Sequence, residues 1–283
     1  MKRTLRGFLL FFACLCGMPV FAQSAVWKIS NGGNVMYLAG SWHVLRQSDY
    51  PLPGEFDMAF ERSEAVAFEA NLLDMAGLKS MTYLRHMRLP PGKTLKTELH
   101  PEVYERLAQK SAAMDIRLED FMQFKPAWAT MFLEVKLLEK LGFTRQGVDF
   151  HYYARARKAG KRRLFMESVE SQLTLFDDID PNEVTEASLG EFEQYAKMNE
   201  YVEEWKRGGF EETEKLIEQI RSQSPVLYDR LFTRRNHAWL PRLERFLKTK
   251  RTEFVIVGFG HLVGKDGLLH LLHSKGYKVE QLK

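Results

Sequence analysis

Two short glycine–histidine motifs contain the residues of this chain that are best suited to chemistry. The first, Gly40–His43, reads GSWH, and the second, Gly258–His261, reads GFGH. Each follows an apolar run, and imidazole nitrogens bind metal ions or transfer protons near neutral pH. The repeat predicts that His43 and His261 share one site. A lone motif of this kind arises easily by chance, and its histidine is then a packing or capping residue.

Two glutamates occupy similar positions. Glu69 follows the apolar run 65–68, and Glu167 follows the run 163–166. If these runs are strands parallel to those before the histidines, all four side chains reach one edge of the sheet. Two imidazoles and a carboxylate are a common ligand set for a divalent metal ion. Without metal, the same groups could act as a general base and an orienting acid. The alternative for each glutamate is an ordinary ion pair.

A third group of polar residues lies in a helical stretch. Arg235 carries a planar guanidinium that suits a carboxylate or an oxyanion, and Asn236 could orient a ligand or a water molecule. The alternative is a solvated basic face, which we favour for Arg234. Four other histidines have no strand before them and are assigned to the surface or to packing: His151, His237, His270 and His273.

The elements around these motifs can be predicted from apolar spacing and turn residues. We expect strands at residues 26–30, 35–39, 65–68, 163–166, 254–257 and 277–282. We expect helices at residues 54–63, 102–114, 118–141, 148–159, 183–248 and 268–274, with Pro126, Gly208, Gly209 and Pro225 interrupting the longer stretches. This order predicts an α/β (α+β) fold, in which a mixed central sheet is covered by helices and carries a large helical insertion.

The N-terminal segment has the pattern of an export signal. Lys2, Arg3 and Arg6 precede the apolar run 7–20, and a cleavage-type sequence ends at Ala22. The run is short for a membrane span. We therefore expect a signal peptide at residues 1–22, one domain at residues 23–283 and a periplasmic or secreted location, with a retained N-terminal anchor as the alternative.

Removal of this segment changes what the composition indicates. Both cysteines, Cys14 and Cys16, lie in it, so the mature chain would have no disulfide, thiol nucleophile or cysteine metal site. The 41 basic and 37 acidic residues become 38 and 37, a formal charge of +1. This balance does not indicate nucleic acid or an anionic membrane as a partner. We expect a peptide or small-molecule substrate.

Other common catalytic patterns do not occur. The chain has no G-x-S-x-G elbow, no P-loop, no strand followed by G-x-G-x-x-G and no H-E-x-x-H helix. Several of its motifs, in contrast, resemble those of the TraB/GumN family, which includes the TIKI metalloproteases. The matching positions are Gly40–His43, the glutamate of Ala67–Ala70, Arg235 with Asn236, and Gly258–Leu262 with Gly267 and Leu268. Gly147–Asp149 and the stretch 167–173 also look family-like, and the resemblance covers nearly all of the chain after residue 25.

The resemblance implies a fold shared with erythromycin esterases and ChaN-like proteins. It implies a catalytic site of His43, Glu69, Arg235, Asn236 and His261, in which His43, Glu69 and His261 hold a divalent metal ion such as Mn, Co or Zn. We therefore expect an exported, metal-dependent hydrolase acting on a peptide or related bond. A metal-free hydrolase of the esterase type, a non-enzymatic binder of haem or a small anion, and a structural or partner-binding role are the alternatives.

Overall fold

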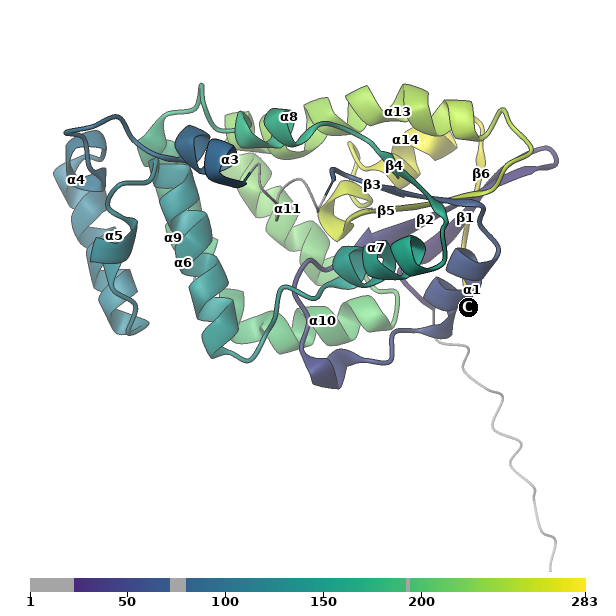
Figure 1. Cartoon of the computed structure of the whole chain (residues 1–283), viewed down its shortest axis with the longest axis horizontal. Coiled ribbons are helices and arrows are strands. Elements are labelled where there is room, and N and C mark those ends of the chain that lie inside the picture. Colours follow the sequence, from purple (N-terminus) through teal and green to yellow (C-terminus); the bar gives the residue numbers. More distant parts are fainter. Residues whose placement is uncertain (1–22, 72–79, 192–193) are drawn as a thin grey trace, which may run out of the picture.

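A six-stranded mixed sheet forms the centre of the molecule (Figure 1). The computed structural model describes residues 23–71, 80–191 and 194–283, so the predicted signal peptide lies outside the described residues. The strands are β1 (Val26–Asn31), β2 (Asn34–Ser41), β3 (Ala65–Phe68), β4 (Arg162–Phe165), β5 (Glu253–Gly258) and β6 (Lys278–Gln281). Each predicted strand is present, with bounds that differ by a few residues.

The strand order β4-β3-β5-β2-β1-β6 places four parallel strands side by side. β5 lies between β3 and β2 and is parallel to both, and β4 is parallel to β3. β1 is antiparallel to β2 and to β6. The register puts Ser41 beside Gly258, and Phe68 beside both Ile256 and Phe165. The carboxyl ends of β2, β3, β4 and β5 therefore share one edge, as the strand-end residues required.

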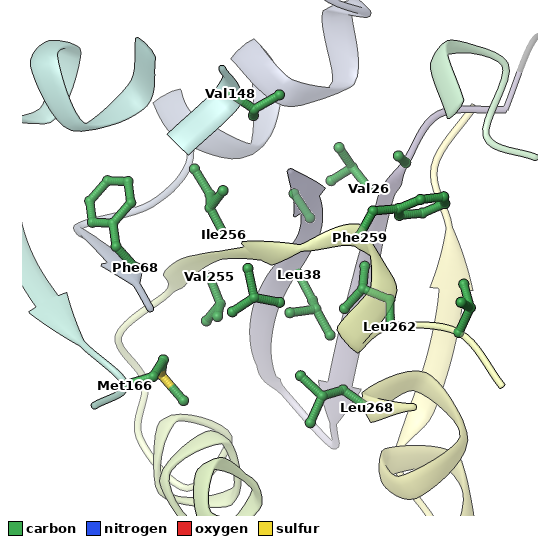
Figure 2. Packing of buried hydrophobic residues seen from close by; sticks show 14 of the residues in the cluster. Val26, Leu38, Phe68, Val148, Met166, Val255, Ile256, Phe259, Leu262 and Leu268 are labelled. Atoms are coloured by element: carbon green, nitrogen blue, oxygen red, sulfur yellow. The ribbon is translucent and has the colours of Figure 1, made fainter. Parts of the chain in front are cut away.

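The central strand β5 is buried along its whole length. A parallel strand covered on both faces is expected to be continuously apolar, because alternate side chains enter the two cores. Figure 2 shows this alternation: Ile256 points towards Val148, and Val255 points towards the opposite face, where Leu268 lies. The β-branched run before the second glycine–histidine motif thus anchors that motif between two packed layers.

Helices cover both faces of the sheet (Figure 1). α1 (Gly54–Glu61) and α7 (Val148–Lys158) lie on one face, while α13 (Arg234–Phe246) and α14 (Leu268–Ser274) lie on the other. Two short 3-10 turns, η1 (Gln47–Asp49) and η5 (Phe259–His261), follow β2 and β5. These layers confirm the predicted α/β class, a mixed sheet covered by helices.

The remaining helices form the predicted insertion. The segment between β3 and α7 contains α3 (Ser80–Met87), α4 (Leu95–Glu98), α5 (Pro101–Ala113), η2 (Leu118–Phe121) and α6 (Pro126–Lys140). The segment between β4 and α13 contains α8 (Val169–Leu173), α9 (Pro181–Glu191), η3 (Gln194–Lys197), α10 (Met198–Lys206), α11 (Glu211–Gln223), α12 (Pro225–Tyr228) and η4 (Asp229–Thr233).

Four of these helices, α4, α5, α6 and α9, gather at the end of the molecule away from the sheet (Figure 1). They enclose a separate apolar cluster that includes Leu95, Leu107 and Leu133. Pro126 begins α6, where its fixed φ and missing N–H are tolerated. No helix among the described residues is long and apolar enough to cross a membrane.

Candidate active site

The carboxyl ends of the parallel strands bring the predicted residues together. Glu69 comes directly after β3, Glu167 follows β4, His43 follows β2, and His261 lies in η5 directly after β5. The amide N–H of Glu167 donates to the carbonyl of Glu69 (2.9 Å), which extends the β3–β4 pairing into the site. The His261 Nε2 and Glu69 Oε1 atoms are 3.9 Å apart. The two glycine–histidine motifs therefore meet at one place.

Arg235 lies between these residues, and its side chain is only 11% exposed. Its Nε donates to Glu167 (3.1 Å). Its Nη1 donates to the Leu231 carbonyl (3.1 Å) and contacts His261 Nε2 (2.8 Å). Its Nη2 donates to Glu69 (2.5 Å) and to Glu167 (2.6 Å). A guanidinium has five N–H groups, and all five have protein acceptors here. Arg235 thus positions its neighbours and has no N–H left for a substrate.

The local helix geometry places Arg235. A π-helical turn, η4, runs directly into α13 and ends one residue before Arg234. Such turns insert a residue into a helix and occur often at functional sites. The guanidinium lies 4.7 Å from the ring centre of Trp239, one turn further along α13. Arg234 is exposed and pairs with Asp229, so it lies outside the site, as expected.

His261 is buried and neutral. Because a guanidinium can only donate, the Nε2 of His261 must accept the bond from Arg235. Its proton is therefore on Nδ1, which donates to Asn236 Oδ1 (2.7 Å). Burial, together with the charge of Arg235, lowers the pKa of His261 to about 3. The Nδ2 of Asn236 donates to the carbonyls of His261 (3.2 Å) and Asp266 (2.8 Å). Asn236 thus fixes the orientation and tautomer of His261 from behind the site.

His43 differs from His261 in its exposure, its partners and its charge. Its side chain is 57% exposed, and its Nδ1 lies 3.2 Å from Asp149 Oδ2. The surrounding chain partly removes water from this half-exposed ring, which would lower the pKa of His43, but the charge and hydrogen bond of Asp149, helped by Glu69, raise it to about 9. At neutral pH His43 is therefore an imidazolium. Its Nε2 forms no hydrogen bond within the described residues, so this N–H is available to a ligand.

The sequence-based prediction gave Asp149 no role. Asp149 lies in the first turn of α7, and its Oδ1 accepts a bond from Ser41 Oγ (3.0 Å). Gly147 permits this approach, since a Cβ there would lie 2.2 Å from the Trp42 carbonyl oxygen and 2.3 Å from the His43 carbonyl carbon. The family-like stretch Gly147–Asp149, at a predicted helix start, was the signal that could have identified it.

Glu69 is held as an anion. Its Oε1 accepts from the Gly258 amide (2.6 Å), and its Oε2 accepts from Arg235 and from Gln172 (3.2 Å). Burial alone would raise the pKa of Glu69, but the charge of Arg235, together with the other charges around it and the Gly258 amide hydrogen bond, outweighs burial and holds this pKa well below its usual range. Gln172, which the sequence-based prediction also missed, donates to Glu167 as well (2.9 Å). It ties the two glutamates together.

Gly258 leaves a space between His43 and Glu69. A Cβ at this position would lie 3.0 Å from His43 Nε2 and 3.2 Å from Glu69 Oε1. The space opens into a cavity of about 430 Å³ that is lined by both residues and by Ser41, Arg235 and His261. Enzyme pockets for small molecules span about 300–1,000 Å³. A hydrogen-bond donor and a carboxylate therefore border the same open space.

Comparison with known proteins assigns the chain to a family. Residues 25–281 match the TraB/PrgY/gumN family. The chain belongs to this family. It is also similar to Metalloprotease TIKI1 of Danio rerio, with 23% identity over an aligned length of 302 positions. The alignment covers 86% of this chain and 60% of the relative. The chain thus spans less than two thirds of that protein's length. No solved structure matches. The resemblance predicted from the motifs is confirmed.

The sequence-based hypothesis assigns a divalent metal ion to His43, Glu69 and His261, which requires free ligand atoms on these three side chains. Among the described residues, no group of three His, Cys, Asp or Glu side chains could hold a metal ion. The single lone pair of His261 Nε2 is used by Arg235, and the guanidinium that also binds Glu69 repels a second cation. In this arrangement the set His43, Glu69 and His261 does not fit a metal ion.

Proposed function

We propose that this TraB/PrgY/gumN family member is a hydrolase that cleaves a peptide or related acyl bond in the cavity beside Gly258. One observation carries the proposal: His43 Nε2 and Glu69 Oε1 lie 3.0 and 3.2 Å from one point beside Gly258, the position that a Cβ would take, and both residues line the same cavity. The family and the similarity to a metalloprotease support hydrolysis as the class of reaction.

The protonation states suit one acid and one base. The pKa of His43 is raised and that of Glu69 is lowered, so at neutral pH the pair is an imidazolium and a carboxylate. Two titratable groups whose environments separate their pKa values are the usual basis of acid–base catalysis. We assign Glu69 as the general base and His43 as the general acid.

The reaction follows from these roles. A water molecule beside Glu69 attacks the carbonyl carbon of the substrate, and its proton passes to the carboxylate of Glu69. The bond from carbon to the leaving amine or alcohol breaks, and the Nε2 proton of His43 passes to that leaving group. The products are a carboxylic acid and an amine or alcohol, and solvent exchange returns Glu69 and His43 to their starting states. Asp149 stabilises the charged form of His43 before the transfer.

The remaining residues position the pair. Arg235 holds Glu69 and contacts His261, and Asn236 fixes the orientation of His261. No step is assigned to a manganese, cobalt or zinc ion, because Arg235 uses the ligand atoms that such an ion would need. The proposal therefore keeps His43 and Glu69 as catalytic residues, as in the sequence-based hypothesis, but without a metal ion.

Activity should be measured on the full chain, purified as its host processes it, with a fluorogenic peptide library and a set of acyl esters. Glu69→Gln and His43→Ala should each lower kcat/KM by about 10²–10⁴-fold, the usual contribution of a general acid or base. His237→Ala, an exposed histidine on α13, is the matched control. Equal turnover by Glu69→Gln and the parent protein would refute the proposal, provided that both unfold at the same temperature.

We also propose that the chain is exported to the periplasm or secreted. The basis is the sequence pattern alone: three basic residues, the apolar run 7–20 and Ala22. N-terminal sequencing of protein recovered from a bacterial periplasm should begin at Gln23. A mature protein that still begins at Met1 would support the anchored alternative.

A further inference from the structure

Apolar side chains form most of the lining of the cavity that contains the catalytic pair, and we call this apolar part of the lining the apolar arm. The polar side chains that line the cavity are Ser41, His43, Glu69, Gln172, Thr213, Arg235 and His261. With the exception of Thr213, each belongs to the catalytic site described above or to its hydrogen bonds. The other side chains lining the cavity are aliphatic, aromatic or, in the case of Met131, a thioether. Within the described residues, every charged side chain that lines the cavity thus belongs to the catalytic site.

Helix α11 forms one wall of this arm. Thr213, Leu216, Ile217 and Ile220 recur at helical spacing, and all four line the cavity. The charged residues of α11 alternate with them, and Glu218 pairs with Arg221 outside the cavity. An amphipathic helix normally buries its apolar face against another element. Here part of that face borders open space, continuous with the catalytic pair.

The other walls come from separate elements. Leu231 and Phe232 of η4 lie close to Arg235 in the chain, and Trp128 and Met131 belong to α6. Ligand pockets of this kind, mostly apolar with a few polar groups at one end, fix a substrate by burial and orient it by hydrogen bonds. Among the described residues, the apolar arm has no charged side chain of its own, so a charged group there would lose its hydration without a partner.

We propose that this apolar arm, formed by Leu216, Ile217, Ile220, Leu231 and Phe232, is a specificity pocket. It binds a bulky apolar group of the substrate next to the bond that is cleaved. This inference rests on the proposed hydrolase function. The group is a large aliphatic or aromatic amino-acid side chain or an acyl chain of several carbons, which share the same recognition chemistry.

The first test is a paired substrate series. One substrate series compares p-nitroanilides of acetyl, butyryl and hexanoyl groups. The other series compares tetrapeptides that differ only in Leu, Phe, Lys or Glu beside the scissile bond. The kcat/KM should rise by at least about tenfold from acetyl to hexanoyl, or from Lys and Glu to Leu and Phe, because each added methylene gains burial. The series with the larger rise in kcat/KM shows whether the pocket recognises an acyl chain or an amino-acid side chain. Equal kcat/KM values for all members within each of the two series would overturn the inference.

The second test changes the wall. Leu216 is half-buried on α11, so Leu216→Lys should lower the ratio of kcat/KM for the apolar substrate to kcat/KM for the shortest substrate by at least about tenfold. Leu216→Gln is the milder variant if the lysine variant is unstable. Leu141→Lys is the control, because Leu141 is 45% exposed and does not line the cavity. Loss of preference in the control alone would contradict the assignment.

A binding measurement separates this inference from the proposed function. Trp42 and Trp128 line the cavity, so intrinsic fluorescence should report titration with octanamide, an uncharged ligand whose binding is read within the first seconds, before cleavage of its amide bond accumulates. Binding by the parent that weakens at least about tenfold in Leu216→Lys supports the apolar pocket even if no substrate is cleaved. Turnover without apolar preference and without octanamide binding would leave the hydrolase standing and overturn the pocket.

Discussion

Arg235 Nη1 contacts His261 Nε2 at 2.8 Å, and because the guanidinium can only donate, this contact determines the protonation of the ring. The histidine of the second glycine–histidine motif is therefore neutral, fully hydrogen-bonded and turned towards an internal cation. The histidine of the first motif is charged, half-exposed and turned towards the cavity. Two motifs that look equivalent in sequence thus have different surroundings: His43 is the proton donor of the proposed reaction, and His261 belongs to the hydrogen-bonded framework around Glu69.

Replacement of Arg235 should destabilise the fold. Arg235→Met would leave the carboxylates of Glu69 and Glu167 buried without their cation, which typically costs about 3–5 kcal/mol. Urea denaturation followed by circular dichroism measures the change in the free energy of unfolding. Arg234→Met is the matched control, because that side chain is exposed and its ion pair is worth about 0–1 kcal/mol. Similar losses in the two variants would contradict the assigned role of Arg235.

The kcat/KM should fall at alkaline pH. His43 acts as an acid, so activity requires its protonated form and is lost as the pH rises through its pKa of about 9. The acid limb should lie below the usual carboxylate range, because the pKa of Glu69 is lowered. A pH–rate profile tests both limbs. Activity that instead rises with pH through 9 would identify neutral His43 as the base and reverse the assignment.

Asp149 should set the position of the alkaline limb. Its carboxylate stabilises the imidazolium of His43, so Asp149→Asn removes the charge and must lower the pKa of His43. The alkaline limb should therefore shift to lower pH, and NMR titration of the His43 ring should show the same shift. Asp120→Asn, an exposed carboxylate in the insertion, is the control. An unchanged profile in Asp149→Asn would exclude coupling between the two residues.

The metal prediction can be tested directly on the purified parent protein. Because Arg235 occupies the ligand atoms of His261 and Glu69, titration with Mn, Co or Zn should give no stoichiometric binding, and a strong chelator should leave activity intact. Calorimetry with elemental analysis measures the first outcome. Binding of about one equivalent that disappears in His43→Ala would restore the metal-dependent hypothesis and require Arg235 to move.

The sequence predicted the edge at which the site forms but not the contacts inside it. The strand-end positions of His43, Glu69, Glu167 and His261 follow from apolar runs, and parallel pairing then brings the four together. That information is local, because each residue stands within three positions of its strand. Periodicity and flanking residues are sufficient to find it.

The partners of these residues depend on long-range packing. Asp149 reaches Ser41 across 108 residues, and Gln172 reaches Glu69 across 103. No local pattern specifies such pairs. Arg235 was found, but its role was expected to be substrate binding, because a sequence shows how many donors a guanidinium has and not how many are already satisfied. The acceptors of Arg235 come from β3, β4, η4 and η5, or from residues directly after them.

Gly258→Ala should separate catalysis from folding. The backbone of Gly258 has φ −51° and ψ 136°, a conformation that alanine adopts readily, so backbone strain should be small. The new Cβ would lie 3.0 Å from His43 Nε2 and 3.2 Å from Glu69 Oε1, so it would press against both proposed catalytic groups and displace them. We expect kcat/KM to fall by about 10²-fold or more, the cost of misplacing reacting groups by about 1 Å, while the melting temperature changes little. A variant that keeps both its stability and its turnover would show that the reaction does not take place between His43 and Glu69.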